Sequence, residues 1–168
     1  MNVRPTRRAV LVSGVLLAVV RAAPSRAAVA DDTGALNALL ATEHAVIYNL
    51  AAAGATLPQA AQALVLAHYD EHRARRDQLT ARIRGLGGMP VAALPAYADP
   101  DLKSRGSADI VVIEQAAVRA YHGAIGVVRE ASARDLCAAA FLAESQHLAL
   151  ARVAAGRAGV PVSFVTGE

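Results

Sequence analysis

The chain has 168 residues, which fits one domain, and it is 55% hydrophobic with few aromatic residues and no tryptophan. Much of the apolar content is alanine, so the composition favours packed helices over sheets. The formal net charge of +3 is misleading, because five of the 17 basic residues and no acidic residue lie in residues 1–30. The other 12 basic residues face 14 acidic ones, a net charge of −2, which removes the main support for a nucleic-acid-binding protein.

The first 30 residues have the pattern of a twin-arginine signal peptide. Arg7 and Arg8 precede an apolar run over residues 9–20, which is shorter than the ~20 residues that a membrane span needs. A small-residue cleavage signal follows at residues 28–30. We therefore predict a mature chain that begins at Asp31, has no stable membrane span, and reaches the periplasm or the exterior by the twin-arginine route. The alternative is an ordinary secretory signal that happens to contain two arginines.

Two helices are predicted in the first half of the mature chain. Apolar residues recur at helical spacing over residues 32–54, with Thr33 as a cap at the start and Gly54 at the end. Pro58 suits the first turn of a second helix, which runs to about Arg84. The connection between them is short, so we expect the two helices to be antiparallel neighbours.

Residues 85–106 have no helical periodicity and read as a connector. They contain three of the seven prolines and four of the twelve glycines. About 22 extended residues can span ~70 Å, whereas a helix of ~26 residues is only ~39 Å long. The connector can therefore cross the whole length of a helix bundle.

A second pair of helices follows the connector. The third is predicted over residues 107–131, with Ser107 as its cap. The fourth is predicted over residues 133–156, with Ser132 and Asp135 as a capping box. Two helices, a long crossover and two more helices predict an all-α, ferritin-like four-helix bundle over residues 31–168, ending in a short C-terminal tail.

Each predicted helix carries polar residues within its apolar stripe. Burying them costs free energy unless they are paired or bind something. Glu43 precedes His72 by 29 residues in the first pair of helices, and Glu114 precedes His147 by 33 residues in the second pair. In antiparallel pairs these similar intervals bring the four residues to a similar level along the bundle. The pattern predicts one central site formed by Glu43, Tyr69, His72, Glu114, Glu144 and His147.

These residues carry a resemblance to a known superfamily. A Glu on each of two helices and Glu-x-x-His on each of the other two is the di-metal signature of ferritin-like proteins, and Glu144-Ser145-Gln146-His147 matches the second element. Over roughly residues 35–157 the chain resembles an uncharacterised family of exported bacterial ferritin-like domains. The segments that carry this resemblance are ATEHAVIYNL and YDEHRARRDQL. The resemblance implies iron or manganese at the predicted site. Tyr69 stands where the second Glu-x-x-His would have its glutamate, which favours one metal ion over two.

Two functions fit this pattern. The first is an exported ferritin-like protein that binds iron or manganese and has a redox or metal-handling role. The second is a metal-free helical binding or scaffold module, in which His72 and His147 neutralise the buried carboxyl groups. The sequence shows no Gly-rich phosphate loop and no nucleophile elbow, and it leaves a homodimer open.

Three further residues carry weaker expectations. His68, one turn before His72, is either an outer partner of the site or a packing residue at the core edge. Arg75 lies in an arginine-rich run that we expect on an outer, solvated face. Cys137 is the single cysteine and shares a helix face with apolar residues, so we expect it to be buried and free.

Overall fold

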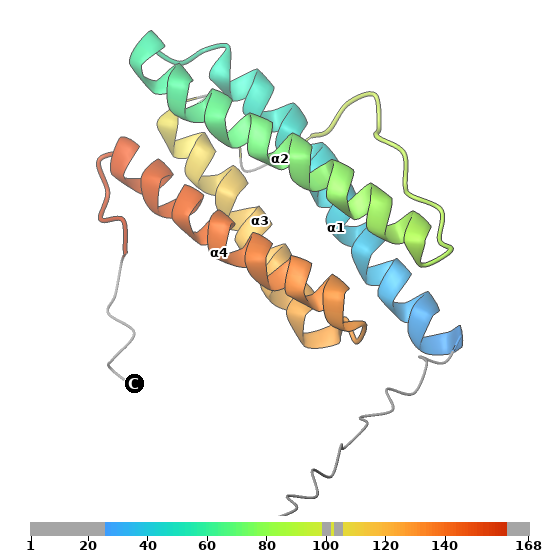
Figure 1. The fold of residues 1–168 in the computed structure, drawn as a ribbon. Helices are drawn as coiled ribbons and strands as arrows, with labels where there is room; N and C mark the ends of the chain where they lie inside the picture. Colours follow the sequence, from blue (N-terminus) through green and yellow to red (C-terminus); the bar gives the residue numbers. More distant parts are fainter. Residues whose placement is uncertain (1–25, 99–101, 103–105, 161–168) are drawn as a thin grey trace, which may run out of the picture.

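Four helices and no strands make up the part of the chain that the computed structural model describes, residues 26–98, 102 and 106–160. They are α1 (Arg26–Gly54), α2 (Gln59–Gly85), α3 (Ser107–Val127) and α4 (Ala131–Ala154). This confirms the predicted all-α four-helix architecture (Figure 1). Most of the predicted signal peptide and of the C-terminal tail lies outside the described residues. None of the described helices is long and apolar enough to span a membrane.

The connector between α2 and α3 is a crossover, as predicted. It runs alongside α1, because the Asn37 side chain donates to the Met89 carbonyl at 3.0 Å and accepts from the Val91 amide at 2.7 Å. Further along, the rings of Tyr48 and Tyr97 lie 5.7 Å apart. The connector thus returns the chain to the end where α2 began, so that α2 and α3 run parallel and α1 and α4 run the other way (Figure 1).

The ends of two helices differ from prediction. α1 begins at Arg26, and the Thr33 hydroxyl donates back to the Ala30 carbonyl at 2.9 Å, so the predicted Thr33 cap is wrong. The reason is the alanine-rich start of the helix, which continues it in the N-terminal direction. α3 has Gly106 at its capping position and no side-chain cap, so the predicted Ser107 cap is wrong, and the helix ends at Val127 rather than near residue 131.

The cap of α4 is also not the predicted one. Glu130 occupies the capping position, and its side chain accepts from the Ala133 amide at 2.7 Å. The predicted box of Ser132 and Asp135 is wrong, because the longer Glu130 side chain reaches the free amide and Ser132 instead donates to Glu130. An ion pair with Arg82, together with these bonds, lowers the pKa of Glu130 to about 2.

The bundle core consists of two apolar clusters with a polar layer between them. One cluster, at the end where α1 begins, comprises Leu36, Leu39, Leu40, Leu79, Ile83, Tyr121, Ala124, Val128, Ala133, Cys137 and Ala140. The other comprises Val46, Leu50, Ala53, Leu57, Val65, Ile110, Val111, Ile113, Ala117 and Ala151. Cys137 is buried and free, as predicted, and burial raises the pKa of its thiol to about 11.

Asp32 ties the start of α1 to the turn between α3 and α4. Its side chain is 1% exposed, and its two oxygens accept from the amides of Arg129 at 2.8 Å and Glu130 at 2.7 Å. Asp32 therefore provides the first buried anchor of the bundle. It would remain in a chain that begins at Asp31.

Replacing Asp32 with alanine should lower the free energy of unfolding by about 1–3 kcal/mol, because two backbone amides lose a charged acceptor. Urea denaturation monitored by circular dichroism would measure the change. The matched control is Asp31→Ala, since Asp31 is the exposed neighbour on the same helix. Equal effects of the two substitutions would contradict a specific role for the Asp32 carboxyl group.

Candidate metal centre

The layer between the two apolar clusters contains seven buried side chains that can carry charge. None is more than 7% exposed, although each lies within an otherwise apolar helix stripe. α2 contributes three of them, α4 two, and α1 and α3 one each. The set is Glu43, His68, His72, Arg75, Glu114, Glu144 and His147.

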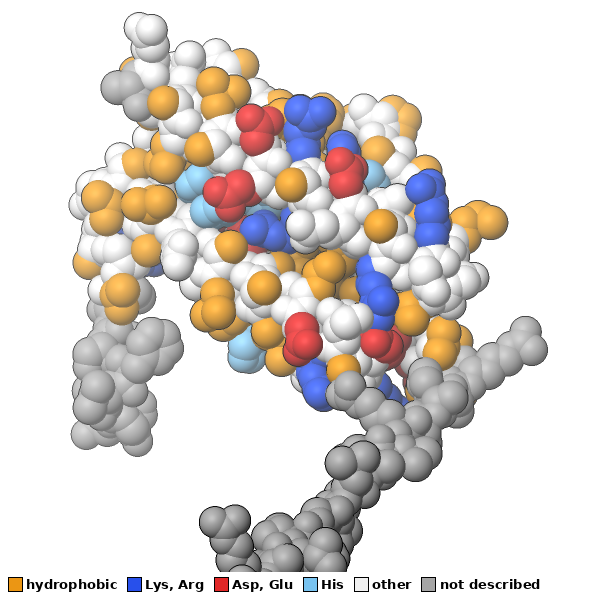
Figure 2. Space-filling model, in the orientation of Figure 1, with side chains coloured by type: hydrophobic (Ala, Val, Ile, Leu, Met, Phe, Trp, Pro, Cys, Tyr) orange, Lys and Arg blue, Asp and Glu red, His pale blue; other side chains and the backbone are white. Residues whose placement is uncertain are grey.

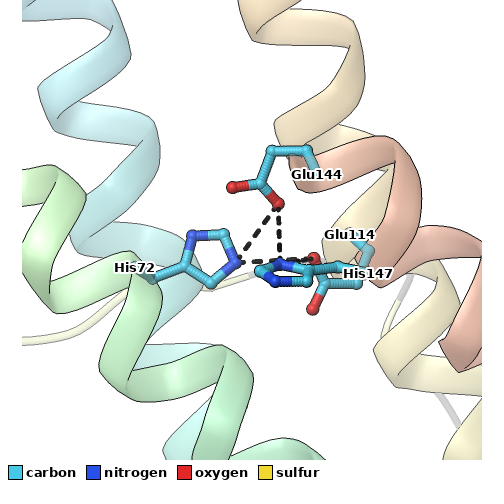
Figure 3. A group of neighbouring side chains, drawn as sticks. All are labelled: His72, Glu114, Glu144 and His147. Carbon is cyan, nitrogen blue, oxygen red and sulfur yellow. Dashed lines mark hydrogen bonds and ion pairs between the residues drawn. The ribbon is translucent and has the colours of Figure 1, made fainter. Parts of the chain in front are cut away.

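Four of these side chains turn donor atoms toward a common centre, as Figure 3 shows. One donor atom each from His72, Glu114, Glu144 and His147 lies within 4.8 Å of the others. His72 Nε2 is 3.4 Å from Glu114 Oε2 and 3.5 Å from Glu144 Oε2. His147 Nδ1 is 3.7 Å and 3.4 Å from the same two oxygens. Donor atoms bound tetrahedrally at about 2.0–2.1 Å from an ion are roughly 3.3 Å apart, so the spacing fits one metal ion.

Two of the inward atoms are buried without a hydrogen-bond partner. Glu144 Oε2 and His147 Nδ1 make no hydrogen bond to any residue that the structure describes. A buried polar atom without a hydrogen bond costs free energy, so each of the two could accept a partner beyond the described residues, such as a metal ion. The mixed nitrogen and oxygen donors suit a divalent transition-metal ion.

The second ring nitrogen of each inward histidine is held by a carboxyl group. His72 Nδ1 lies 2.7 Å from Glu43 Oε2, and Glu43 Oε1 accepts from the Tyr121 hydroxyl at 2.5 Å. His147 Nε2 lies 3.0 Å from Glu71 Oε2. A histidine that binds metal through one nitrogen typically donates through the other to a carboxylate, which fixes the ring.

The second oxygen of each inward glutamate is held as well. Glu114 Oε1 lies 2.7 Å from His68 Nδ1, and Glu144 Oε1 accepts from the Arg75 guanidinium group. Each of the four inward side chains therefore has one outer partner. We call Glu43, His68, Glu71 and Arg75 the outer ring.

The structure brings five of the six predicted site residues into the polar layer. Glu43 is not one of the four inward side chains, and its carboxyl group contacts the Nδ1 atom of His72. Tyr69 lies apart from the layer: its ring is half-buried against the second apolar cluster, with the Arg73 guanidinium 5.7 Å from its centroid. The physical reason is the rotation of α2, which turns His68 rather than Tyr69 toward Glu114.

Two members of the outer ring were not predicted. Arg75 was expected on a solvated face, but it is 7% exposed and pairs with Glu144, so that prediction is wrong. Glu71 is exposed, yet its side chain reaches His147 from the edge of α2. The spacing of residues 68, 71, 72 and 75, which puts them on one helix face, is the signal that could have found both. His68, left open by the sequence, is an outer partner of the site.

The paired charges shift the pKa values of the layer in opposite directions. Burial alone would lower the pKa of His72, but hydrogen bonds with Glu114 and Glu43 outweigh it and raise the pKa to about 9. Burial alone would raise the pKa of Glu114, but hydrogen bonds with His68 and His72 lower it to about 2. Burial lowers the pKa of His147. His72 and Arg75 thus both place positive charge against the glutamates at neutral pH.

The polar layer reaches the surface between α2 and α4. These two helices make fewer contacts than the other neighbouring pairs of the bundle. In the space-filling view, pale blue histidine side chains are visible on this face beside acidic and basic ones (Figure 2). The Glu71 side chain, 56% exposed, lies at this edge and contacts His147, which is 6% exposed. Glu71 and His147 are therefore the parts of the site that lie nearest to solvent.

Comparison with family models gives a match to the family described as "Domain of unknown function (DUF4439)", over residues 35–161. The chain belongs to the DUF4439 family. The match covers all of α2, α3 and α4 and most of α1. No curated protein matches the chain.

Solved structures similar to this DUF4439 chain share the ferritin-like fold. A conserved hypothetical protein of Mycobacterium tuberculosis, rv2844, is 23% identical, with a TM-score of 0.73 over 82% of this chain and 99% of that one. A dodecameric thioferritin, the bacterioferritin-related protein of Bacteroides fragilis, is 20% identical, with a TM-score of 0.65 over 76% and 86%. Dps92 of Deinococcus radiodurans is 14% identical, with a TM-score of 0.63 over 76% and 87%.

The stability of the metal-free DUF4439 protein should depend on pH at both ends of the range. The raised pKa of His72 adds stability that is fully present below about 6.5 and is lost as the pH rises through about 9. The lowered pKa of Glu114 adds stability that is present above about 4.5 and is lost as the pH falls through about 2. Urea denaturation with a chelator present should show the free energy of unfolding falling by roughly 3 kcal/mol between pH 6 and pH 10.

The variant His72→Gln tests the assignment of this alkaline loss. Glutamine cannot gain the charge, so the variant should be less stable at pH 6 and should lose much less between pH 6 and pH 10. An unchanged alkaline slope in His72→Gln would contradict the role given to His72.

Proposed function

We propose that this DUF4439 protein binds a divalent iron or manganese ion through His72, Glu114, Glu144 and His147. The observation that carries the proposal is the pair of buried, unpartnered atoms, Glu144 Oε2 and His147 Nδ1, which point into the same centre. The spacing of the four donor atoms and the outer ring that holds their second atoms support it.

A redox or metal-handling role is the function that such a site fits. Bound iron or manganese would supply Lewis-acid and one-electron redox chemistry at the centre of the bundle. The protein itself would hold His72 and His147 in fixed ring orientations through Glu43 and Glu71. The ferritin-like fold alone does not decide the function, so the proposal rests on the side chains.

The second candidate is a metal-free helical binding or scaffold module. The observation in its favour is the charge balance, because His72 and Arg75 already face the buried glutamates. It leaves one atom each of Glu144 and His147 without a hydrogen bond among the described residues, which is why we place it second. A homodimer built on the exposed Leu142, Leu150 and Val153 of α4 would suit either function and would show as a doubled mass in sedimentation.

Added Fe(II) or Mn(II) should raise the melting temperature of the metal-depleted protein, because an ion that binds only the native state stabilises it. The substitution Glu144→Ala should remove this rise and should also lower stability without metal by about 1–3 kcal/mol, since Arg75 loses its partner. Differential scanning calorimetry with and without each metal would measure both effects.

A matched control separates the site from surface acids. Asp70→Ala removes an exposed carboxyl group from α2, one that pairs only loosely with Arg73 at 3.6 Å. This variant should keep the metal-dependent rise. Absence of any rise in the wild-type protein would sink the metal proposal and favour the metal-free module.

We further propose that residues 1–30 are a cleaved twin-arginine signal peptide, so that the protein works in the periplasm or outside the cell. The arginine pair, the short apolar run and the small-residue cleavage signal support this. The predicted cleavage point after Ala30 falls within the first two turns of α1, two residues before the Asp32 anchor.

Replacing Arg7 and Arg8 with lysines should block export while leaving the charge of the segment unchanged. Cell fractionation and N-terminal sequencing of the exported protein would measure transport and cleavage together. Replacing Arg21 and Arg26 with lysines is the control and should leave export intact. Normal export of the Arg7 and Arg8 variant would exclude the twin-arginine route.

A further inference from the structure

We propose that the guanidinium group of Arg75 stands in for a second cation in the polar layer, so that the chain holds one metal ion. Replacing Arg75 with a small neutral residue should then open a second cation position between Glu144 and Glu71. The inference rests on the proposed metal-binding function and adds to it the number of ions and the residue that sets this number.

The first argument is the use of the carboxyl oxygens. A carboxyl group can bridge two ions through its two oxygens only when both oxygens face metal. In this layer the second oxygen of Glu114 faces His68 at 2.7 Å, and that of Glu144 faces Arg75. Both oxygens of Glu43 are engaged, one by Tyr121 and one by His72. The protein thus fills with its own donors the positions that a second ion would need.

The second argument is the permanence and burial of the charge. An arginine side chain keeps its proton in proteins, and Arg75 is 7% exposed. Its guanidinium lies over the Tyr121 ring, with Cζ 5.9 Å from the ring centroid, and its Nη2 atom lies 4.0 Å from Glu71 Oε2. A second divalent ion at this place would meet a fixed positive charge in a poorly hydrated region, where repulsion is strong.

The third argument is what removal of the guanidinium would leave behind. Glu144 Oε1 would lose its donor, and Glu71, whose Oε2 atom lies 4.0 Å from Arg75 Nη2, would border the vacated space. Two carboxyl groups from different helices are oxygen ligands of the kind that iron and manganese accept. The site of the second ion would therefore be made of residues that are already in place.

The experiment is equilibrium dialysis of the metal-depleted full chain against Mn(II) alone, with bound manganese counted by elemental analysis. The wild-type protein and Arg75→Lys, which keeps the positive charge, should bind one ion per chain. Arg75→Ala should bind two, and its first ion at least about tenfold more tightly, because a neighbouring positive charge is gone. Arg73→Ala is the matched control, since Arg73 is exposed on the same helix, and it should bind one ion with unchanged affinity.

The outcomes separate the two proposals. Two ions in the wild-type protein or in Arg75→Lys would overturn the inference about Arg75 but leave metal binding intact. One ion in Arg75→Ala, at any affinity, would also overturn it. No ion in the wild-type protein would overturn the inference and the proposed function together. Arg75→Ala also leaves the buried Glu144 carboxyl group without its ion-pair partner. The melting temperature of this variant with and without Mn(II) therefore provides a second measurement. The rise caused by manganese should exceed that of the wild-type protein.

Discussion

Three glutamates buried at the centre of an otherwise apolar bundle are the constraint on which the rest of this structure depends. Glu43, Glu114 and Glu144 are each less than 1% exposed, and burial of such groups is costly unless each is paired. Two positively charged side chains of α2, His72 and Arg75, offset this cost. The two apolar clusters on either side then close the polar layer off from water at both ends.

The four helices contribute unequally to the layer. α2 supplies one inward side chain, His72, and three of the four outer partners, whereas α4 supplies two inward side chains and no outer partner. Any metal ion bound between them would therefore join α4 to α2, the least closely packed of the neighbouring helix pairs. Metal binding would strengthen that contact, which links the function of the site to the stability of the fold.

Much of the fold and of the inward group could be predicted from the sequence, because both follow from helical periodicity. Glu43, Glu114, Glu144 and His147 interrupt apolar stripes at matching levels, and the crossover follows from the length of the connector. The place of Tyr69 could not be predicted, since the rotation of α2 by a few tens of degrees decides whether residue 68 or residue 69 faces the centre. Arg75 was missed for a related reason: within a run of arginines, only tertiary packing shows which one is buried.

The central claim is that two imidazoles and two carboxyl groups hold one metal ion at the centre of the bundle, and X-ray absorption spectroscopy of the manganese-loaded protein tests it most directly. The account predicts a first shell of nitrogen and oxygen only, outer-shell scattering from two imidazole rings, and no metal–metal scattering. The His72→Gln variant should lose the contribution of one ring. A manganese spectrum without imidazole scattering, such as that of the hydrated ion, would contradict the account.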